Sequence, residues 1–221
     1  MTSQTGALAE AAKPGDEKGR RPIGVCDWMI LKRQKLGAFG RAQEIGADGI
    51  ELDMGSLGAR ETFENALADP GVQRQFLDES QTTGVQICSV AMSGFYAQSF
   101  AERPTYQRMI GDCLATMTAL GVRIAFLPLG VQGDLQKRPE LRPVIVERLQ
   151  KVGARAAEAG VIVGIETALD AAEERRLLEQ IDSPSIRSYF NFANALQAGR
   201  DVCQELRTLG REYVCQIPCT A

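Results

Sequence analysis

The sequence predicts an α/β protein of the (β/α)₈ barrel type, incomplete, with about seven strand–helix units and the eighth missing. Three observations lead to this prediction. Apolar runs of strand length recur along the chain, segments with helical spacing lie between them, and polar residues gather where the runs end. Because the apolar runs are near-continuous rather than alternating, we expect both faces of each strand to be covered, as in a parallel sheet.

The expected strands are spaced so that each gap suits one strand–helix–strand crossover. They cover residues 23–28, 48–53, 85–92, 123–130, 161–167, 186–192 and 213–217. The expected helices lie between them and cover residues 36–47, 72–84, 104–121, 139–160, 171–181 and 194–210. Four of these helical segments end in glycine just before the next strand, and glycine is the residue most often found after a helix end.

Apolar residues three or four positions apart justify the helices. In the first segment they are Leu36, Phe39, Ala42 and Ile45. The segment 104–121 begins with a proline, which suits the first turn of a helix because the missing N–H would be unpaired there. Its apolar face comprises Met109, Ile110, Cys113, Leu114 and Met117.

The chain is expected to form one domain, residues 22–221, because no linker or change in composition divides it. Residues 1–21 are small, polar and charged, which predicts a disordered N-terminal tail. An open doubly wound sheet is the alternative architecture. Such a sheet often carries a G-x-G-x-x-G turn, which is absent here, and polar residues at nearly every strand end are typical of a barrel.

The composition excludes several classes of function. The 221 residues contain no histidine, which excludes Ser-His-Asp and Cys-His catalysis and any zinc site built on imidazole. The net charge of −3 and the lack of a Lys/Arg run argue against nucleic-acid binding. No stretch approaches the roughly 18 apolar residues of a membrane span, so we expect no membrane partner.

The cysteines predict a reducing compartment. Six are present, and none forms a C-x-x-C pair. Cys215 and Cys219 lie on one expected strand, where about 13 Å would separate them, too far for a disulfide. The N-terminus also lacks the apolar core of a secretory signal. Together these features predict free thiols and a cytoplasmic protein.

Glu166 is the sharpest candidate for catalysis, because it ends the apolar run "VIVGI" and should stand at the end of a buried strand. A carboxylate there needs a partner, a proton or a metal. A salt bridge to an arginine is the structural alternative. Asn191 holds the same position one strand later, where its amide oxygen could bind a hard cation or satisfy loop backbone. Asn194 could bind a substrate hydroxyl, although a helix cap is the favoured interpretation.

Four further residues are candidates or neighbours of candidates. Glu51 and Asp53 point to the same side of one strand and could serve acid–base work or bind sugar hydroxyls. The alternatives are a core ion pair for Glu51 and a loop position for Asp53, the latter favoured. Trp28 could stack on a sugar ring or pack in the core. Ser93 begins a long loop after the third strand that we interpret as facing the substrate.

These strand-end motifs resemble those of the xylose isomerase-like TIM-barrel superfamily, and more closely the sugar phosphate isomerase/epimerase family. The resemblance covers about residues 23–219 and rests on "GVCDW", "GADGIELDMGSLG", "ICSVAMSGFYAQSF", "FLPLGVQGDL", "VGIETALDAAEE" and "YFNFANAL". It implies a (β/α)₈ barrel and a divalent metal, Mn²⁺ or Mg²⁺. It also implies two carboxylates that move a proton at the carbon next to the carbonyl of a small sugar or sugar phosphate.

The resemblance assigns Glu166 to the first metal ligand and to one of the two proton-transfer carboxylates. Asn191 falls where many members have a metal-binding aspartate. Pro218 stands where the family usually has a histidine ligand, and the glutamate of an eighth strand has no counterpart. One interpretation is therefore a metal-assisted isomerase or epimerase. The alternative is a truncated or degenerate member that does not catalyse and at most binds a polyol weakly. Open strand edges would also be compatible with a homo-oligomer.

Overall fold

The computed structural model describes residues 20–30 and 33–218. The strands are β1 (Gly24–Cys26), β2 (Gly49–Asp53), β3 (Gln86–Ala91), β4 (Ile124–Pro128), β5 (Ile162–Glu166), β6 (Ile186–Tyr189) and β7 (Val214–Gln216). The α-helices are α1 (Asp27–Ile30), α2 (Gly37–Glu44), α3 (Pro70–Thr83), α4 (Tyr106–Leu120), α5 (Arg142–Glu158), α6 (Ala171–Ile181), α7 (Phe192–Gln197) and α8 (Val202–Leu209). Short 3₁₀ turns are η1 (Ala66–Ala68), η2 (Ser93–Tyr96), η3 (Pro139–Leu141) and η4 (Arg211–Tyr213).

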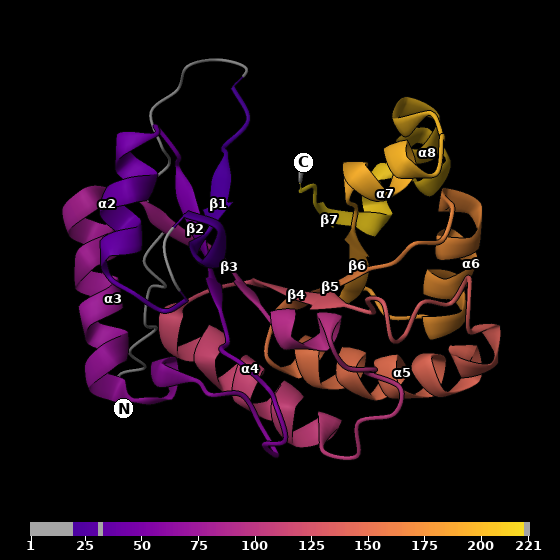
Figure 1. Ribbon diagram of the computed structural model, residues 1–221, viewed down its shortest axis with the longest axis horizontal. Helices are drawn as coiled ribbons and strands as arrows, with labels where there is room; N and C mark the ends of the chain where they lie inside the picture. Colours follow the sequence, from indigo (N-terminus) through magenta and orange to yellow (C-terminus); the bar gives the residue numbers. More distant parts are fainter. Residues whose placement is uncertain (1–19, 31–32, 219–221) are drawn as a thin grey trace, which may run out of the picture.

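The seven strands form one parallel sheet in the order β1-β2-β3-β4-β5-β6-β7. In Figure 1 the sheet curls from β1 to β7, with the long helices α2 to α6 on its outside. Among the described residues the strand pairing begins at β1 and ends at β7, so the sheet is not closed. The fold is an incomplete (β/α)₈ barrel, as the sequence predicts.

The side chains of the strands divide between two apolar regions. Ile50 and Leu52 of β2 belong to the large core between the sheet and the helices. The intervening residues of that strand point the other way, because successive side chains alternate across a strand. A smaller cluster of Ala91, Phe126 and Tyr189 forms the interior of the curled sheet. Both faces of the strands are therefore covered, which explains their near-continuous apolar sequence.

Local signals set the helix ends. The Asp69 side chain accepts hydrogen bonds from the backbone N–H groups of Gly71 and Val72 at the start of α3, and Pro70 occupies its first turn. The same helix ends at Gly84, which has a φ of 73°. Asp170 caps α6 by accepting from the N–H of Glu173 at 2.8 Å. The glycine expected at the end of α3 is thus confirmed, and aspartate caps that the sequence analysis did not predict set the starts of α3 and α6.

Three expected elements differ from the structure. The first strand ends at Cys26 and residues 27–30 form helix α1 instead. The strand expected over 186–192 ends at Tyr189, because Asn191 already caps α7. The helix expected over 194–210 is two helices, since Gly199 has a φ of 68° and Asp201 caps α8 by accepting from the N–H of Gln204.

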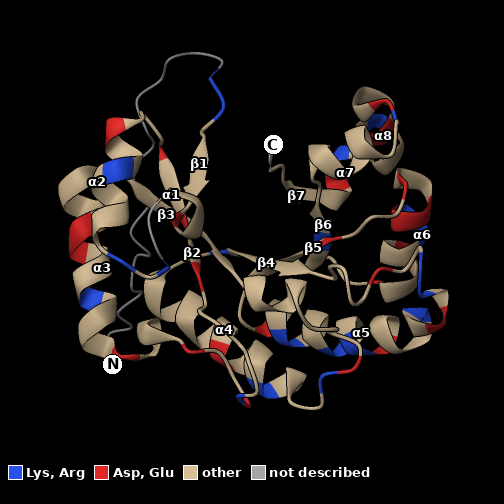
Figure 2. Ribbon diagram, in the orientation of Figure 1, with Lys and Arg blue, Asp and Glu red and all other residues tan. Residues whose placement is uncertain are grey.

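Charged residues lie mainly on the helices and loops, as the coloured ribbon of Figure 2 shows. None of the helices in the described part of the chain has the length and apolar character to cross a lipid bilayer. The five described cysteines are free. Residues 1–19 of the expected tail lie outside the described residues, while Arg20 pairs with Asp48 at the start of β2.

The turn after β2 depends on Gly55, which has a φ of 93° and would place a Cβ atom 2.2 Å from the backbone oxygen of Glu64. Gly46 has a similar φ of 72°, but a Cβ there would meet nothing within 4 Å.

We expect Gly46→Ala to lower the free energy of unfolding by about 1 kcal/mol, the cost of the left-handed conformation. Gly55→Ala should cost about 3 kcal/mol or more, because a backbone clash is added. Urea unfolding monitored by circular dichroism measures both free energies. Equal losses of stability in the two variants would contradict the backbone clash expected at Gly55.

Candidate functional site

Glu166 is the last residue of β5 and is 6% exposed. Its Oε2 accepts a hydrogen bond from the hydroxyl of Tyr96 at 2.6 Å. Its Oε1 accepts from Nδ2 of Asn191 at 2.6 Å and from Nδ2 of Asn194 at 3.3 Å. No arginine pairs with it among the described residues, so the expected alternative of a salt bridge is wrong. The buried carboxylate is instead satisfied by three neutral donors.

Asn191 uses both ends of its amide. Its Oδ1 accepts from the backbone N–H of Ala193 at 2.9 Å and so caps α7. Because the cap requires an oxygen, the amide orientation is fixed and Nδ2 faces Glu166. The expectation that this amide satisfies loop backbone is confirmed. The side chain also brings a donor, rather than a second negative charge, to the end of β5.

Asn194 lies in the first turn of α7 rather than at a helix cap. The caps of the two neighbouring helices are Asn191 and Asp201, so the favoured interpretation of Asn194 as a cap is wrong. Its Nδ2 donates to the backbone oxygen of Thr167 at 3.0 Å as well as to Glu166. The side chain therefore ties α7 to the end of β5.

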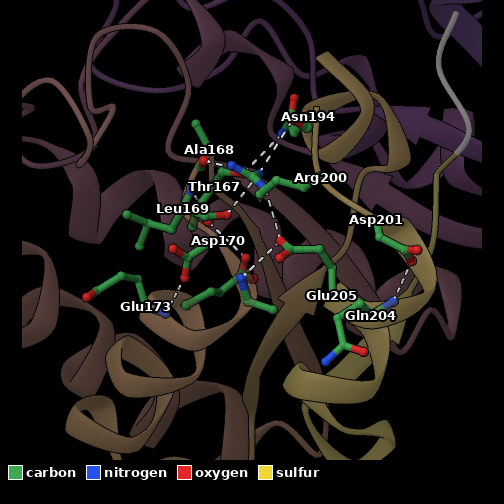
Figure 3. Close-up of polar contacts among 12 residues, drawn as sticks. Thr167, Ala168, Leu169, Asp170, Glu173, Asn194, Arg200, Asp201, Gln204 and Glu205 are labelled. Carbon is green, nitrogen blue, oxygen red and sulfur yellow. Dashed lines mark hydrogen bonds and ion pairs between the residues drawn. The ribbon is translucent and has the colours of Figure 1, made fainter. Parts of the chain in front are cut away.

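Arg200 holds the loop that follows Glu166, as Figure 3 shows. Its Nη2 donates to the backbone oxygens of Ala168 and Leu169 at 3.4 and 3.3 Å. Its Nε lies 3.1 Å from Glu205, whose carboxylate also accepts from the N–H of Ala171. The sequence analysis missed this arginine, because in the sequence it is one basic residue within an apparently continuous helix.

Glu51 lies inside the curled sheet and is 2% exposed. Its Oε2 accepts from the hydroxyls of Ser89 at 2.7 Å and Tyr189 at 2.9 Å, and its Oε1 accepts from the thiol of Cys26 at 3.3 Å. Burial raises the pKa of this carboxyl, and the hydroxyl donors partly oppose that rise. The alternative of a core ion pair is wrong, because these partners are uncharged donors.

Aromatic rings line the interior beside Glu166. The ring of Phe126 lies 4.3 Å from that of Tyr189 and 5.8 Å from that of Tyr96. Trp28 is half-buried and packs against the same cluster. Tyr96 joins this wall to the carboxylate and was not among the predicted site residues. Its place in the loop that begins at Ser93 is the signal that could have identified it.

A second polar group lies at the carboxyl ends of β1, β2 and β3. Asp53 is the last residue of β2, not a loop residue, and is fully buried. Its Oδ1 lies 3.2 Å from Nε of Arg33, whose Nη2 lies 3.4 Å from the Ser93 hydroxyl. Asp27 lies beside them, and burial raises its pKa to about 6. The structure thus brings Ser93 and Trp28 to the same end of the barrel as Glu166, while Glu51 lies one layer deeper.

Polar residues at the carboxyl ends of several parallel strands are the arrangement typical of barrel enzymes. The family model described as "xylose isomerase-like TIM barrel" matches residues 39–218. The chain belongs to this family. The resemblance found in the sequence is thereby confirmed.

Several proteins similar to this xylose isomerase-like barrel are named as epimerases. The 2-epi-5-epi-valiolone 7-phosphate 2-epimerase of Actinoplanes sp. is 25% identical over 185 residues, which are 81% of this chain and 64% of that protein. The structure of 3-keto-D-glucoside 4-epimerase from E. coli matches with a TM-score of 0.72, at 16% identity, over 91% of this chain and 80% of that one. D-psicose 3-epimerase from Clostridium cellulolyticum H10 gives 0.70, at 13% identity, over 90% and 73%. This chain thus spans less than two thirds of the curated relative.

Many xylose isomerase-like barrels use a divalent metal, so the donors around Glu166 decide whether this chain fits one. Within residues 20–30 and 33–218, no three His, Cys, Asp or Glu side chains gather where they could hold a metal ion. Tyr96, Asn191 and Asn194 point O–H or N–H hydrogens at Glu166, and hard cations need oxygen lone pairs instead. The Asn191 oxygen is used by the helix cap. The described residues therefore do not fit the implied metal site.

A second buried carboxylate lies directly behind the site. Glu174 is in the first turn of α6, and its Oε2 accepts from the hydroxyl of Thr167 at 2.9 Å. Its Oε1 has no hydrogen-bond partner among the described residues. Burial raises its pKa to about 7, although the nearby hydroxyls of Ser188 and Thr167 lower it. The charges of Glu166 and Glu205 add to the rise.

This shift predicts how stability depends on pH. In the unfolded chain Glu174 ionises near pH 4.5, whereas in the folded protein it stays protonated up to about pH 7. Its effect is absent at lower pH, and stability is lost as the pH rises through this window, by at most about 3 kcal/mol. Glu174→Gln should remove this loss, so its advantage over the parent in free energy of unfolding grows from pH 4.5 to 7. Denaturant titrations at several pH values test this, and a constant difference would contradict it.

The donor set predicts weak metal binding. We expect the parent to bind Mn²⁺ with a dissociation constant in the high micromolar range or weaker, measured by isothermal titration calorimetry. Asn191→Asp would put two carboxylates in contact, so it should lower the melting temperature, and Mn²⁺ should restore more stability to this variant than to the parent. Sub-micromolar Mn²⁺ binding by the parent would contradict the conclusion that the residues around Glu166 do not fit a metal. Asn194→Asp is the matched control, since its contact with Glu166 is longer at 3.3 Å.

Proposed function

We propose that this chain binds a small sugar at the carboxyl ends of its strands and that Glu166 moves a proton at the carbon next to the sugar's carbonyl. The reaction class is that of the sugar isomerases and epimerases. The names of the relatives support the substrate class, since each named enzyme is an epimerase of a sugar or cyclitol. The proposal for the activity is drawn from the chain's own site.

The carboxylate of Glu166 is the observation that carries the proposal. It stands at the end of β5, lies 6% exposed and has no cation beside it among the described residues. An ionised carboxylate paired with a metal or an arginine would be a weaker proton acceptor than one held by neutral donors. Its donors, Tyr96, Asn191 and Asn194, fix the position of both oxygens. Fixed geometry is what general-base catalysis requires.

One carboxylate defines which proton transfers are within reach. Glu166 can remove the proton from the carbon next to the carbonyl, which gives an enediolate, and return it to the former carbonyl carbon on the same face. With transfer of the neighbouring hydroxyl proton to the former carbonyl oxygen, this is isomerisation. Inversion at a single carbon needs a proton delivered from the opposite face, hence a second group. The hydroxyl of Tyr96 and the amides of Asn191 and Asn194 donate to Glu166 itself and hold it as a base. The described residues therefore favour same-face transfer.

Sugar binding without turnover is the second candidate. The chemistry of the hydrogen-bond donors around Glu166 is the observation in its favour. The family resemblance implies that a metal stabilises the enediolate. The residues around Glu166 do not fit a metal, so this stabilisation would be missing here. The aromatic wall of Trp28, Phe126 and Tyr96 would still offer a stacking surface to a sugar ring. Measuring binding and proton exchange separately distinguishes the two candidates.

Proton exchange with solvent tests the proposal. The chain is incubated in D₂O with D-fructose, D-psicose or D-tagatose, with and without Mn²⁺, and deuterium incorporation next to the carbonyl is followed by NMR. We expect incorporation with at least one sugar, and Glu166→Gln should reduce its rate by about 10²- to 10⁴-fold. Glu158→Gln, at the exposed end of α5, is the control and should not change it.

The outcomes are distinct. Equal exchange rates for the parent and Glu166→Gln would rule out this residue as the base. Sugar binding by ligand-observed NMR with no exchange in the parent would establish the second candidate instead. If neither binding nor exchange is found, both candidates are wrong for these sugars.

A further inference from the structure

The polar group at the end of β2 contains an acceptor that no residue of the site satisfies. Asp53 is 0% exposed, and its Oδ1 accepts from the N–H of Gly55 at 2.7 Å and pairs with Arg33 at 3.2 Å. Its Oδ2 has no hydrogen-bond partner among the described residues. Leaving a buried carboxylate oxygen unpaired is costly, and such atoms in native structures call for an explanation. A ligand hydroxyl that donates to Oδ2 would remove the cost.

Hydrogen bonds of the next residue, Gln34, hold the chain at Arg33 close to Asp53. The N–H of Gln34 donates to Asp27 at 2.8 Å, and Nε2 of Gln34 donates to the backbone oxygen of Asp53 at 2.7 Å. The N–H of Asp53 in turn donates to Asp27 at 3.2 Å. The backbone next to Arg33 is therefore anchored to Asp27 and Asp53, and the guanidinium pairs with Asp53 while its side chain remains 47% exposed. An anchored and exposed guanidinium can still donate to a ligand.

The charges around Arg33 select against an anion. The one guanidinium of this group already pairs with Asp53, and the carboxyl of Asp27 lies beside Asp53, whose N–H it accepts. Burial raises the pKa of both carboxyls, but even a protonated carboxyl is only neutral and adds no positive charge that would attract an anion. A phosphate placed here would meet at least as much negative as positive charge. A neutral diol suits the site better, because one hydroxyl can donate to Asp53 while the other accepts from Arg33.

The neighbouring residues complete a surface for a sugar. The Ser93 hydroxyl accepts from Nη2 of Arg33 at 3.4 Å and lies near enough to the Asp53 carboxyl to lower its pKa, so it lines the same group. Trp28 follows Asp27 in the chain and packs against the cluster that contains Ala91, the partner of Asp53 in the register of β2 and β3. An aromatic ring beside an Asp–Arg pair is a combination that fits both the apolar face and the hydroxyl groups of a sugar.

We propose that Arg33, Asp53 and Ser93 form a subsite for two neighbouring hydroxyls of an unphosphorylated sugar. The inference rests on the proposed function, since it names the substrate class of the same barrel end. It specifies that the part of the ligand lying over β1 to β3 is neutral and polyhydroxylated. Glu166, on β5, contacts a different part of that ligand.

Binding measurements with deoxy sugars test the subsite. D-fructose, D-psicose, D-tagatose and the monodeoxy analogues of the best binder are titrated by ligand-observed NMR. In the parent, removal of a hydroxyl bound by the subsite should weaken binding about tenfold, the effect of a hydrogen bond to a charged group. Arg33→Met should weaken binding of the full sugar to a similar extent. In this variant the full sugar and that deoxy analogue should bind with equal affinity. Arg33→Lys should recover only part of the affinity, because an ammonium group cannot bond Asp53 and a ligand in the same fork.

Two controls separate binding from folding and from catalysis. Arg41→Met removes an arginine that pairs with Glu44 on the exposed face of α2, and should leave all affinities unchanged. Glu166→Gln should slow proton exchange by about 10²- to 10⁴-fold but preserve the tenfold difference in affinity between the sugar and its deoxy analogue. Unfolding curves establish that each variant is folded.

Several results would overturn the subsite. They are parent affinities that do not change with any deoxy analogue, a hydroxyl preference that survives in Arg33→Met, and no binding of any of the three sugars. Binding of inorganic phosphate or fructose 6-phosphate that depends on Arg33 and weakens with salt would show an anion site instead. If exchange depends on Glu166 while Arg33→Met changes nothing, the proposed function stands and the subsite fails. If Arg33 governs binding and no exchange occurs, the subsite stands without the activity.

Discussion

The interior of the protein depends on the buried carboxylate of Glu51, whose partners in the described part of the chain are neutral donors rather than a cation. Glu51 accepts hydrogen bonds from Ser89, Tyr189 and Cys26, which lie on β3, β6 and β1. In a closed barrel the backbone ladder alone fixes the positions of opposite strands, whereas the sheet here ends at β1 and β7. The bonds from Cys26 and Ser89 reinforce strand pairs that the ladder already makes, whereas the bond from Tyr189 connects β2 to β6, which the ladder does not pair. Because each donor is neutral, removing one would leave a buried carboxylate under-satisfied, which gives these contacts a large effect on the interior.

The same principle sets the chemistry at the end of β5. Hydroxyl and amide donors satisfy Glu166 where a metal or an arginine would otherwise be needed. Asn191 is decisive, because the demand of α7 for a capping oxygen turns its amide hydrogens toward Glu166. Arg200 then fixes the following loop through backbone oxygens and does not touch the carboxylate. The site is thus organised by helix capping and loop anchoring, both of which are ordinary structural functions applied next to a reactive group.

The strands were predictable because burial on both faces leaves a continuous apolar signal, and Glu166 was predictable because it interrupts that signal at a strand end. The partners of Glu166 were not, since Tyr96 lies 70 positions away and only the fold brings it near. The helix α1 was missed for a similar reason: the groups that bind the Asp27 side chain belong to Gln34 and Asp53. Choosing between Asn191 and Asn194 as the cap required the end of β6 to within two residues, finer than sequence patterns allow.

The parallel order of the sheet has a consequence for how the chain folds. Every strand pairs with its neighbours in sequence, so each ladder requires closure of only one crossover. The bond between Glu51 and Tyr189 is different, because it joins residues 138 positions apart. The entropy lost in closing a loop grows with its length, and contacts between distant residues slow folding. We therefore expect neighbouring ladders to assemble first, while the bond across the interior forms late, when the intervening strands have already shortened the effective distance. Formation of that bond would then report completion of the native interior.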